Sequence, residues 1–347
     1  VEGNELVIAS HGRGFWVLDD IAPLRQWSPA IASVDVHLFT PPTAVRSGPS
    51  PVISWLLRSA AKTTTLQILD SAGAVLRTMA LDSTKVDSLA KDASHADSAR
   101  VDSMRTAAAS VRRYAGGFLP KPVAGLNKVW WDLRAQGIES FPGMILWGGG
   151  TAGPALPPGR YTVRLTADGR TATAPITIVR NPRLPVTDAD LRAQYAFSEK
   201  VRGRATTANH AVIEIRRVKA QLADRYTRSN DAGLHTAGDT LAAHASATEE
   251  KVYQVRNRSG QDPLNFPIKV NNRLATLLSM NEQGDGRPTN NLDDIFGILS
   301  RELAGYETDL RQIWRTDLAR VNGELGRLSL PPLDPQCTEV RGCAATP

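Results

Sequence analysis

The apolar residues of this 347-residue chain change their spacing close to residue 184. Before that point, short runs alternate apolar and polar side chains, as residues 160–165 do, which is typical of half-buried strands. After it, apolar residues recur every three or four positions over long stretches, which indicates helices with one buried face. A Pro-containing junction at residues 181–185 separates the two patterns. The sequence therefore predicts a β-rich part followed by a helical part.

Residues 36–183 form the β-rich part. Strand character is found at residues 36–39, 53–57, 64–68, 75–79, 128–133, 160–165 and 174–179. Turn residues such as 70–73 and 167–169 lie between these runs. Short strands separated by turn signals predict an antiparallel β-sandwich.

A motif order within this part resembles a known module. A strand, a Leu-Asp-x-x-Gly turn and a second strand are followed by Gly125-Leu126-Asn127-x3-Trp131-Asp132-Leu133-Arg134, and later by Pro157-Pro158-Gly159-x-Tyr161. This order resembles the immunoglobulin-like module of flagellar hook-capping proteins. The resemblance implies that Trp131 is the aromatic centre of the core. We expect Asp132 and Arg134 to pair locally rather than to act in catalysis.

Residues 82–114 interrupt the strands with a segment rich in Ala, Ser and Asp. Its apolar residues recur mostly at helical spacing, which predicts an inserted helix or helical hairpin. Two roles stay open for it: a solvated addition to the sandwich, or a docking arm for a partner, since a lone helix with a thin apolar stripe needs tertiary support.

The helical part, residues 184–330, begins with Thr187 and Asp190, which form a capping-box-like start. Four helices are expected, at residues 187–226, 239–257, 268–280 and 291–328. The two long ones would reach about 55 Å each. We expect them to pack antiparallel, with the shorter helices completing an elongated bundle.

The first 35 residues predict a hairpin of two strands, at residues 5–10 and 15–18, joined by a tight turn at 12–14. One hairpin cannot bury two apolar faces, so it needs a sheet to join. The run Ala9-Ser10-His11-Gly12-Arg13-Gly14-Phe15-Trp16-Val17-Leu18-Asp19-Asp20 resembles the end of the last blade in bacterial secreted BNR-repeat or sortilin-type β-propeller proteins, which are often labelled glycosyl hydrolases. In that family an immunoglobulin-like module and a helical tail follow the propeller. The resemblance implies that this chain is the C-terminal portion of a larger secreted protein and that residues 1–35 are a remnant of the blade with its linker.

A glycine-rich segment at residues 135–159 is the strongest candidate for a contact surface. It carries five large apolar residues close together: Phe141, Met144, Ile145, Leu146 and Trp147. Three alternatives stay open. The segment could cover the sandwich core, it could present a contact patch to a partner protein, since Trp, Phe and Met are common interface anchors, or Trp147 could stack on a sugar ring.

The net charge and the cysteines bear on partners and compartment. Residues 1–183 hold 20 Lys and Arg against 14 Asp and Glu, whereas residues 184–347 hold 21 of each, so the basic excess of +6 lies in residues 1–183. The only cysteines, Cys337 and Cys343, lie in a tail at residues 331–347. A local disulfide between them is the favoured interpretation, and it implies an oxidising compartment, either periplasmic or extracellular.

The remaining motifs exclude several classes of function. The histidines His210, His235 and His244 lack the spacing of metal ligands, and no catalytic or phosphate-binding motif occurs, so we expect no metal, cofactor or enzyme activity in this chain. Its arginines are scattered between acids, which argues against nucleic acid as a partner. No stretch is long and apolar enough for a membrane span. The sequence favours a non-catalytic interaction module, such as an accessory subunit of a periplasmic or membrane-bound protein assembly. The alternative is an accessory, carbohydrate-binding region of a secreted propeller-type glycoside hydrolase.

Overall fold

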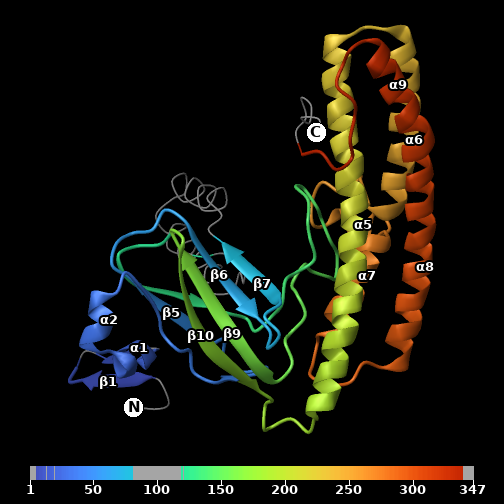
Figure 1. Cartoon of the computed structure of the whole chain (residues 1–347). Helices are drawn as coiled ribbons and strands as arrows, with labels where there is room; N and C mark the ends of the chain where they lie inside the picture. Colours follow the sequence, from blue (N-terminus) through green and yellow to red (C-terminus); the bar gives the residue numbers. More distant parts are fainter. Residues whose placement is uncertain (1–4, 13, 19, 81–118, 120, 339–347) are drawn as a thin grey trace. The chain divides into compact units, whose positions relative to one another are not determined.

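The structure is a computed structural model that describes residues 5–12, 14–18, 20–80, 119 and 121–338 (Figure 1). Its chain divides into two compact units. The β unit comprises Val1–Gln136 and Gly153–Tyr195, and the helical unit comprises Gly137–Ala152 and Ala196–Pro347. The predicted division into a mixed β and α protein is confirmed. The insertion expected at residues 82–114 lies outside the described residues.

Two of the three described sheets of the β unit share one core. One sheet has the strand order β4-β10-β9-β6-β7 and the other β3-β5-β8. Their bounds are β3 Val36–Leu38, β4 Ala44–Val45, β5 Val52–Leu57, β6 Thr64–Leu69, β7 Val75–Ala80, β8 Gly125–Trp130, β9 Gly159–Ala167 and β10 Arg170–Val179. The seven predicted strands are therefore present, within a few residues of their expected bounds.

The sheets are not purely antiparallel, which corrects the prediction. The short strand β4 pairs with the end of β10 in parallel, through Ala44 with Ile178 and Val45 with Val179. The sequence around β4 is rich in Pro, Gly and Ser and shows no strand pattern. Its position is stabilised by the buried side chain of Arg46, which donates to the carbonyl oxygens of Ala155 and Leu156 at 2.8 Å each. A buried guanidinium needs such acceptors, so it holds this connection against the sheet edge.

Apolar residues of both sheets meet in a single cluster. Trp131 is fully buried in it, as expected, next to residues such as Trp55 and Val163. Its indole nitrogen donates to the carbonyl oxygen of Arg134 at 3.1 Å, which satisfies the one polar atom of the side chain. The carboxylate of Asp132 accepts the backbone N–H of Arg134 at 3.2 Å, and it forms an ion pair with Arg77 at 2.8 Å. These polar contacts thus tie β7 to the chain that follows β8.

The predicted N-terminal hairpin is present as β1 Leu6–Ser10 and β2 Gly14–Leu18. Every described side chain of β2 is exposed, including Phe15 at 79% and Trp16 at 65%. Two short helices that the sequence did not predict, α1 Ala22–Gln26 and α2 Pro29–Ser33, follow the hairpin. Each has a proline in its first turn, where the missing N–H costs nothing.

The helical unit confirms the four predicted helical regions. Helix α5 covers Asp188–Arg228, α6 Ala232–Val252, α7 Val270–Asn281 and α8 Asn290–Ile313. A π-helical turn, Trp314–Leu318, joins α8 to α9, which covers Ala319–Arg327, and a short 3-10 turn, Asp262–Leu264, lies between α6 and α7. At 41 residues, α5 is about 60 Å long. The first two turns of α5, up to Tyr195, belong to the β unit.

The capping box at the start of α5 is confirmed. The backbone N–H of Asp190 donates to Thr187 Oγ1 at 3.1 Å, and the backbone N–H of Thr187 donates to Asp190 Oδ2 at 3.2 Å. These two bonds satisfy donors that the first turn of a helix leaves unpaired.

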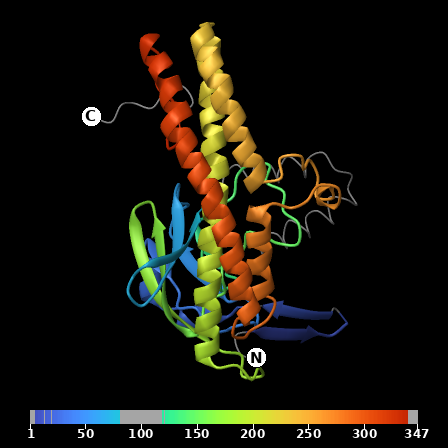
Figure 2. The same cartoon turned by 90° about the vertical axis from the view of Figure 1, so that its right-hand side faces the viewer.

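The expectation that the two long helices pack antiparallel is wrong. Val201 and Ala205, early in α5, share a core cluster with Leu303 of α8, whereas Leu222, late in α5, clusters with Leu325 of α9. The helices α5 and α8–α9 therefore run in the same direction. The physical reason is that α6 and α7 lie in succession along α5 and together make one return pass (Figure 2), so that α8 begins at the level where the buried part of α5 begins.

Close packing around Gly238 of α6 leaves no room for a side chain. A Cβ atom at this position would overlap the hydroxyl of Tyr226 and would lie 2.9 Å from Leu222 Cδ1. Replacement Gly238→Ala should therefore destabilise the helical unit by about 1–3 kcal/mol through overpacking. Gly203→Ala in α5 is the control, because no atom lies within 4 Å of its added Cβ; it should increase the free energy of unfolding by about 0.5–1 kcal/mol. Urea unfolding followed by circular dichroism measures both, and equal effects of the two substitutions would contradict this packing argument.

Asp168, in the turn between β9 and β10, makes the stability of the β unit depend on pH. Its carboxylate accepts the backbone N–H groups of Lys62 at 3.0 Å and Thr63 at 2.8 Å, and these bonds lower its pKa. A lowered pKa means that the ionised form stabilises the fold above the ordinary pKa of about 4, and that this contribution is lost as the pH falls below it. Asp168→Asn should therefore lower the melting temperature at pH 7, and the difference from the parent should shrink towards zero near pH 2. A difference that stays constant over this range would show that the charge is not involved.

Candidate functional site

Residues 137–152, here called the Trp147 segment, carry all five predicted contact residues. The segment belongs to the helical unit, although strands of the β unit precede and follow it in the sequence. Its base is closed by a hydrogen bond from the backbone N–H of Ile138 to the carbonyl oxygen of Thr151, at 2.9 Å. The alternative in which residues 135–159 cover the core between the sheets holds only near their ends. Ala135 and Leu156 belong to that core, whereas the buried side chains Ile138 and Phe141 belong to a core cluster of the helices.

Phe141 anchors the segment in this core and is 6% exposed. Its ring meets that of Tyr253, which follows α6, edge to face, with the ring centroids 5.0 Å apart. The guanidinium of Arg216, from α5, lies 4.6 Å from the centroid of Phe141 and 5.4 Å from that of Tyr253. Such a cation over aromatic rings is attracted by their quadrupoles. One cation therefore joins the segment to α5 and to the end of α6.

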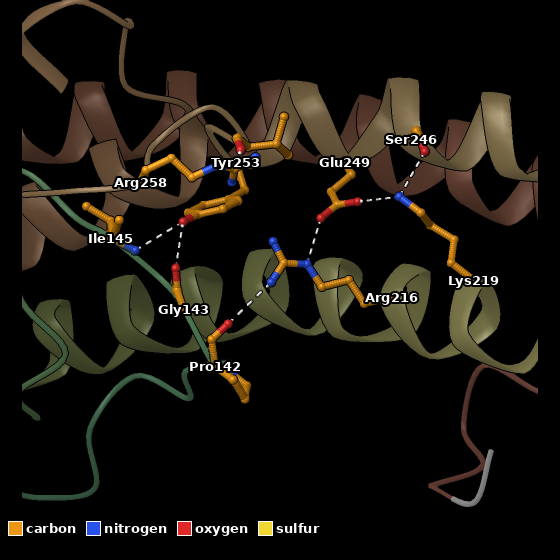
Figure 3. A network of polar contacts seen from close by, with 10 residues as sticks. Pro142, Gly143, Ile145, Arg216, Lys219, Ser246, Glu249, Tyr253 and Arg258 are labelled. Carbon is orange, nitrogen blue, oxygen red and sulfur yellow. Dashed lines mark hydrogen bonds and ion pairs between the residues drawn. The ribbon is translucent and has the colours of Figure 1, made fainter. Parts of the chain in front are cut away.

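A buried carboxylate holds Arg216 in this position (Figure 3). Glu249 of α6 has a side chain that is 5% exposed, and it accepts from Arg216 Nε at 2.7 Å and from Lys219 Nζ at 3.2 Å. Lys219 also donates to Ser246 Oγ at 2.9 Å. A carboxylate removed from water must be paired and hydrogen-bonded, and both conditions are met here.

The hydroxyl of Tyr253 forms two hydrogen bonds with the backbone of the segment. It donates to the carbonyl oxygen of Gly143 at 3.2 Å and accepts the N–H of Ile145 at 3.1 Å (Figure 3). Met144 and Leu146 pack against the helical core as half-buried side chains, and Ile145 is half-buried as well. Four of the five predicted contact residues are thus wholly or partly occupied by contacts within the helical unit.

Trp147 is the exception among them, because its backbone is fixed while its side chain is 40% exposed. The side-chain amide of the buried Asn272, on α7, accepts the N–H of Trp147 at 2.8 Å and donates to its carbonyl oxygen at 2.7 Å. The chain then passes so close to α7 that a Cβ on Gly149 would lie 2.6 Å from the backbone nitrogen of Thr276. The segment therefore presents one aromatic side chain from a rigid support.

The start of the segment is attached to α5. Asn209 Nδ2 donates to the carbonyl oxygen of Glu139 at 2.6 Å, and the Glu139 carboxylate pairs with His210. His235 stacks on Tyr226 with ring centroids 4.0 Å apart, and His244 Nδ1 lies 2.7 Å from Asp317. In the part of the chain that the structure describes, no group of three or more His, Cys, Asp or Glu side chains could hold a metal ion.

The residues that support the segment were not predicted from the sequence. Arg216, Tyr253 and Asn272 lie 74 to 125 positions further along the chain than the segment residues they contact, and Glu249 acts through Arg216. Each looks like an ordinary polar or aromatic helix residue. The polar Asn271 and Asn272 inside the otherwise apolar pattern of the third predicted helix were the one available signal, because buried amides require partners.

The tail carries Cys337, which is buried, and its carbonyl oxygen accepts from Gln221 Nε2 of α5 at 3.3 Å. Cys343 lies outside the described residues, so the disulfide between them stays a prediction. No described helix is both long enough and apolar enough to cross a bilayer.

No protein-family model matches the chain, and no curated protein matches it. Among solved structures, the BSP domain of a biofilm-associated protein is 15% identical over 43% of this chain and 16% of its own, with a TM-score of 0.19. CopC from Methylosinus trichosporium OB3b is 12% identical over 43% of this chain and 98% of its own, with a TM-score of 0.20. Both scores are too low to assign a fold or a function to this chain.

The hydroxyl of Tyr253 provides a direct test of how the segment is held. Tyr253→Phe removes two hydrogen bonds to the segment but keeps the ring against Phe141 and Arg216. Loss of a bond worth about 1 kcal/mol should accelerate amide hydrogen exchange at Ile145 about fivefold. Tyr306→Phe is the control, because its hydroxyl donates to Glu302 on α8 and not to the segment. Unchanged protection of Ile145 in the Tyr253 variant would contradict this role.

Proposed function

We propose that this chain is a non-catalytic interaction module of an extracytoplasmic protein and that Trp147 is its main contact residue. In this proposal the β unit is an immunoglobulin-like sandwich, the helical unit is an elongated bundle, and both follow the last blade of a propeller-type protein. The compartment is the periplasm or the cell exterior, where a disulfide between Cys337 and Cys343 would persist. The partner is a protein, such as a component of a larger periplasmic or membrane-bound assembly.

The geometry of Trp147 carries the proposal. The partly exposed indole offers a large apolar face that a partner can cover. Asn272 binds both backbone polar groups of Trp147, which lowers the entropy that the segment would lose on binding. Rigid aromatic anchors of this kind carry much of the binding energy at protein interfaces.

The N-terminal hairpin supports a second attachment. Val7, Ile8, Phe15, Trp16 and Val17 are all exposed on a two-stranded sheet. Two strands alone are marginally stable in water, so the hairpin is suited to extend a larger sheet. A preceding propeller blade is the sheet we propose, on the resemblance of residues 9–20 to the end of such a blade.

The second candidate function is a carbohydrate-binding accessory region of a secreted propeller-type glycoside hydrolase. The half-exposed indole of Trp147 favours it, because an aromatic face can stack on a sugar ring. A protein partner is preferred, because no group of carboxylates accompanies Trp147 among the segment's described residues.

Trp147→Ala should separate the two functions. On the protein proposal, the parent chain co-purifies with a complex from detergent-solubilised membranes of the source cells, Trp147→Ala reduces recovery at least tenfold, and neither binds insoluble polysaccharides. Trp27→Ala is the matched control, because that indole is 50% exposed in the other unit. Both variants should keep the parent melting temperature within about 2 °C, since exposed side chains contribute little to stability. Retention of the parent on a polysaccharide panel, lost in Trp147→Ala, would overturn the protein proposal in favour of the carbohydrate one.

A further inference from the structure

A second candidate site lies between α5 and α8, away from the contacts of Trp147. It is a pocket of about 280 Å³ within the helical unit. From α5 it is lined by Thr207, His210, Ala211 and Glu214, and from α8 and the π-helical turn by Glu307, Leu310, Arg311 and Trp314. Each set is spaced three, four and seven residues apart, so each forms one stripe about two helical turns long. Because the helices run in the same direction, the two stripes face each other along the pocket.

The charges at one end of the pocket are already paired. Arg204 of α5 donates to both carboxylate oxygens of Glu307 at 2.9 Å, and His210 pairs with Glu139. A bidentate pair of this kind is geometrically well defined. This end therefore offers no unbalanced charge to a ligand.

Two other lining residues carry opposite charges that are not balanced. Glu214 Oε1 accepts from the neutral amide of Gln336 at 2.5 Å, and within the described residues the Glu214 carboxylate forms no ion pair. Arg311 donates to the carbonyl oxygen of Glu307 at 3.2 Å and to Thr308 Oγ1 at 2.9 Å, and within the same residues it also lacks a carboxylate partner. The pocket thus has one anion and one cation on different helices, and neither forms an ion pair among the described residues.

The wall between these charges is apolar and irregular. Ala211, Leu310 and the ring of Trp314 provide it, and Ala211 and Leu310 also form a small core cluster with Ile215 and Ala245. Trp314 is the first residue of the π-helical turn Trp314–Leu318. Such turns are rare and occur frequently at functional sites, because the extra residue redirects side chains.

We propose that this pocket binds a small zwitterion, namely a free α-amino acid. The carboxylate of Glu214 faces the ligand's ammonium group, the guanidinium of Arg311 binds the ligand's carboxylate, and Trp314 contacts its carbon skeleton. Arginine is suited to carboxylates because its planar N–H groups match the two oxygens. A volume of about 280 Å³ lies just below the usual range for ligand pockets and is large enough for one amino acid.

The test is isothermal titration calorimetry of the full chain with each of the twenty L-amino acids. At least one should bind with a dissociation constant below 1 mM, on the order expected for a small ligand with two charged contacts. The amine and the carboxylic acid that each lack one charged group of that amino acid should bind at least tenfold more weakly. Binding by none of the twenty, or equal binding by either analogue, would overturn the proposal.

Substitutions locate the site independently of the choice of ligand. Glu214→Gln and Arg311→Gln should each weaken binding of the same amino acid at least tenfold. Glu250→Gln and Arg320→Gln are the matched controls, because these residues are exposed on α6 and α9 and line no part of the pocket; they should bind like the parent. If the site variants bind like the controls while keeping the parent circular dichroism spectrum, the amino acid binds elsewhere and the assignment to this pocket is wrong. The outcome is independent of Trp147, so it does not depend on the proposed function.

Discussion

The Trp147 segment depends on an ion pair that the protein buries. The carboxylate of Glu249, removed from water, pairs with both Arg216 and Lys219, and the same pairing holds Arg216 over the rings of Phe141 and Tyr253. The pair therefore does more than offset its own desolvation. It determines where Phe141 enters the helical core, and from that anchor the segment continues to Tyr253 and then to Asn272.

The same segment shows how rigidity and exposure can coexist. Loops are usually more mobile than helices and strands, because few contacts hold their backbone. Here the polar backbone groups of Trp147 are satisfied by a side-chain amide that is itself buried. The indole is then left free to contact something else, which is the physical basis of the proposed interaction role. The pocket between α5 and α8 uses a different principle, in which opposite charges on different helices are the recognition elements.

Much of the secondary structure could be predicted from local pattern. Alternation identified the seven main strands, the apolar stripe identified the four helical regions, and Thr187 with Asp190 marked the start of α5. The buried position of Trp131 was also predicted. The features that the sequence did not predict have a common cause, namely contacts between residues far apart in the chain. The strand β4 has no apolar pattern of its own and is held by the bonds of Arg46 to carbonyl groups near residue 155. The Trp147 segment is supported by side chains that lie more than 60 positions further along the chain than the residues they contact.

The sequence by itself determined which segments are strands and which are helices, because the spacing of apolar residues is a local property that each segment carries alone. It also determined that the segment at residues 137–152 is rich in apolar side chains. Only the tertiary structure decided that this segment joins the helical core, that α5 and α8 run in the same direction, and that Glu214 and Arg311 line one pocket. These features depend on contacts between residues far apart in the chain. Their energies come from burial and charge pairing, which no local pattern encodes.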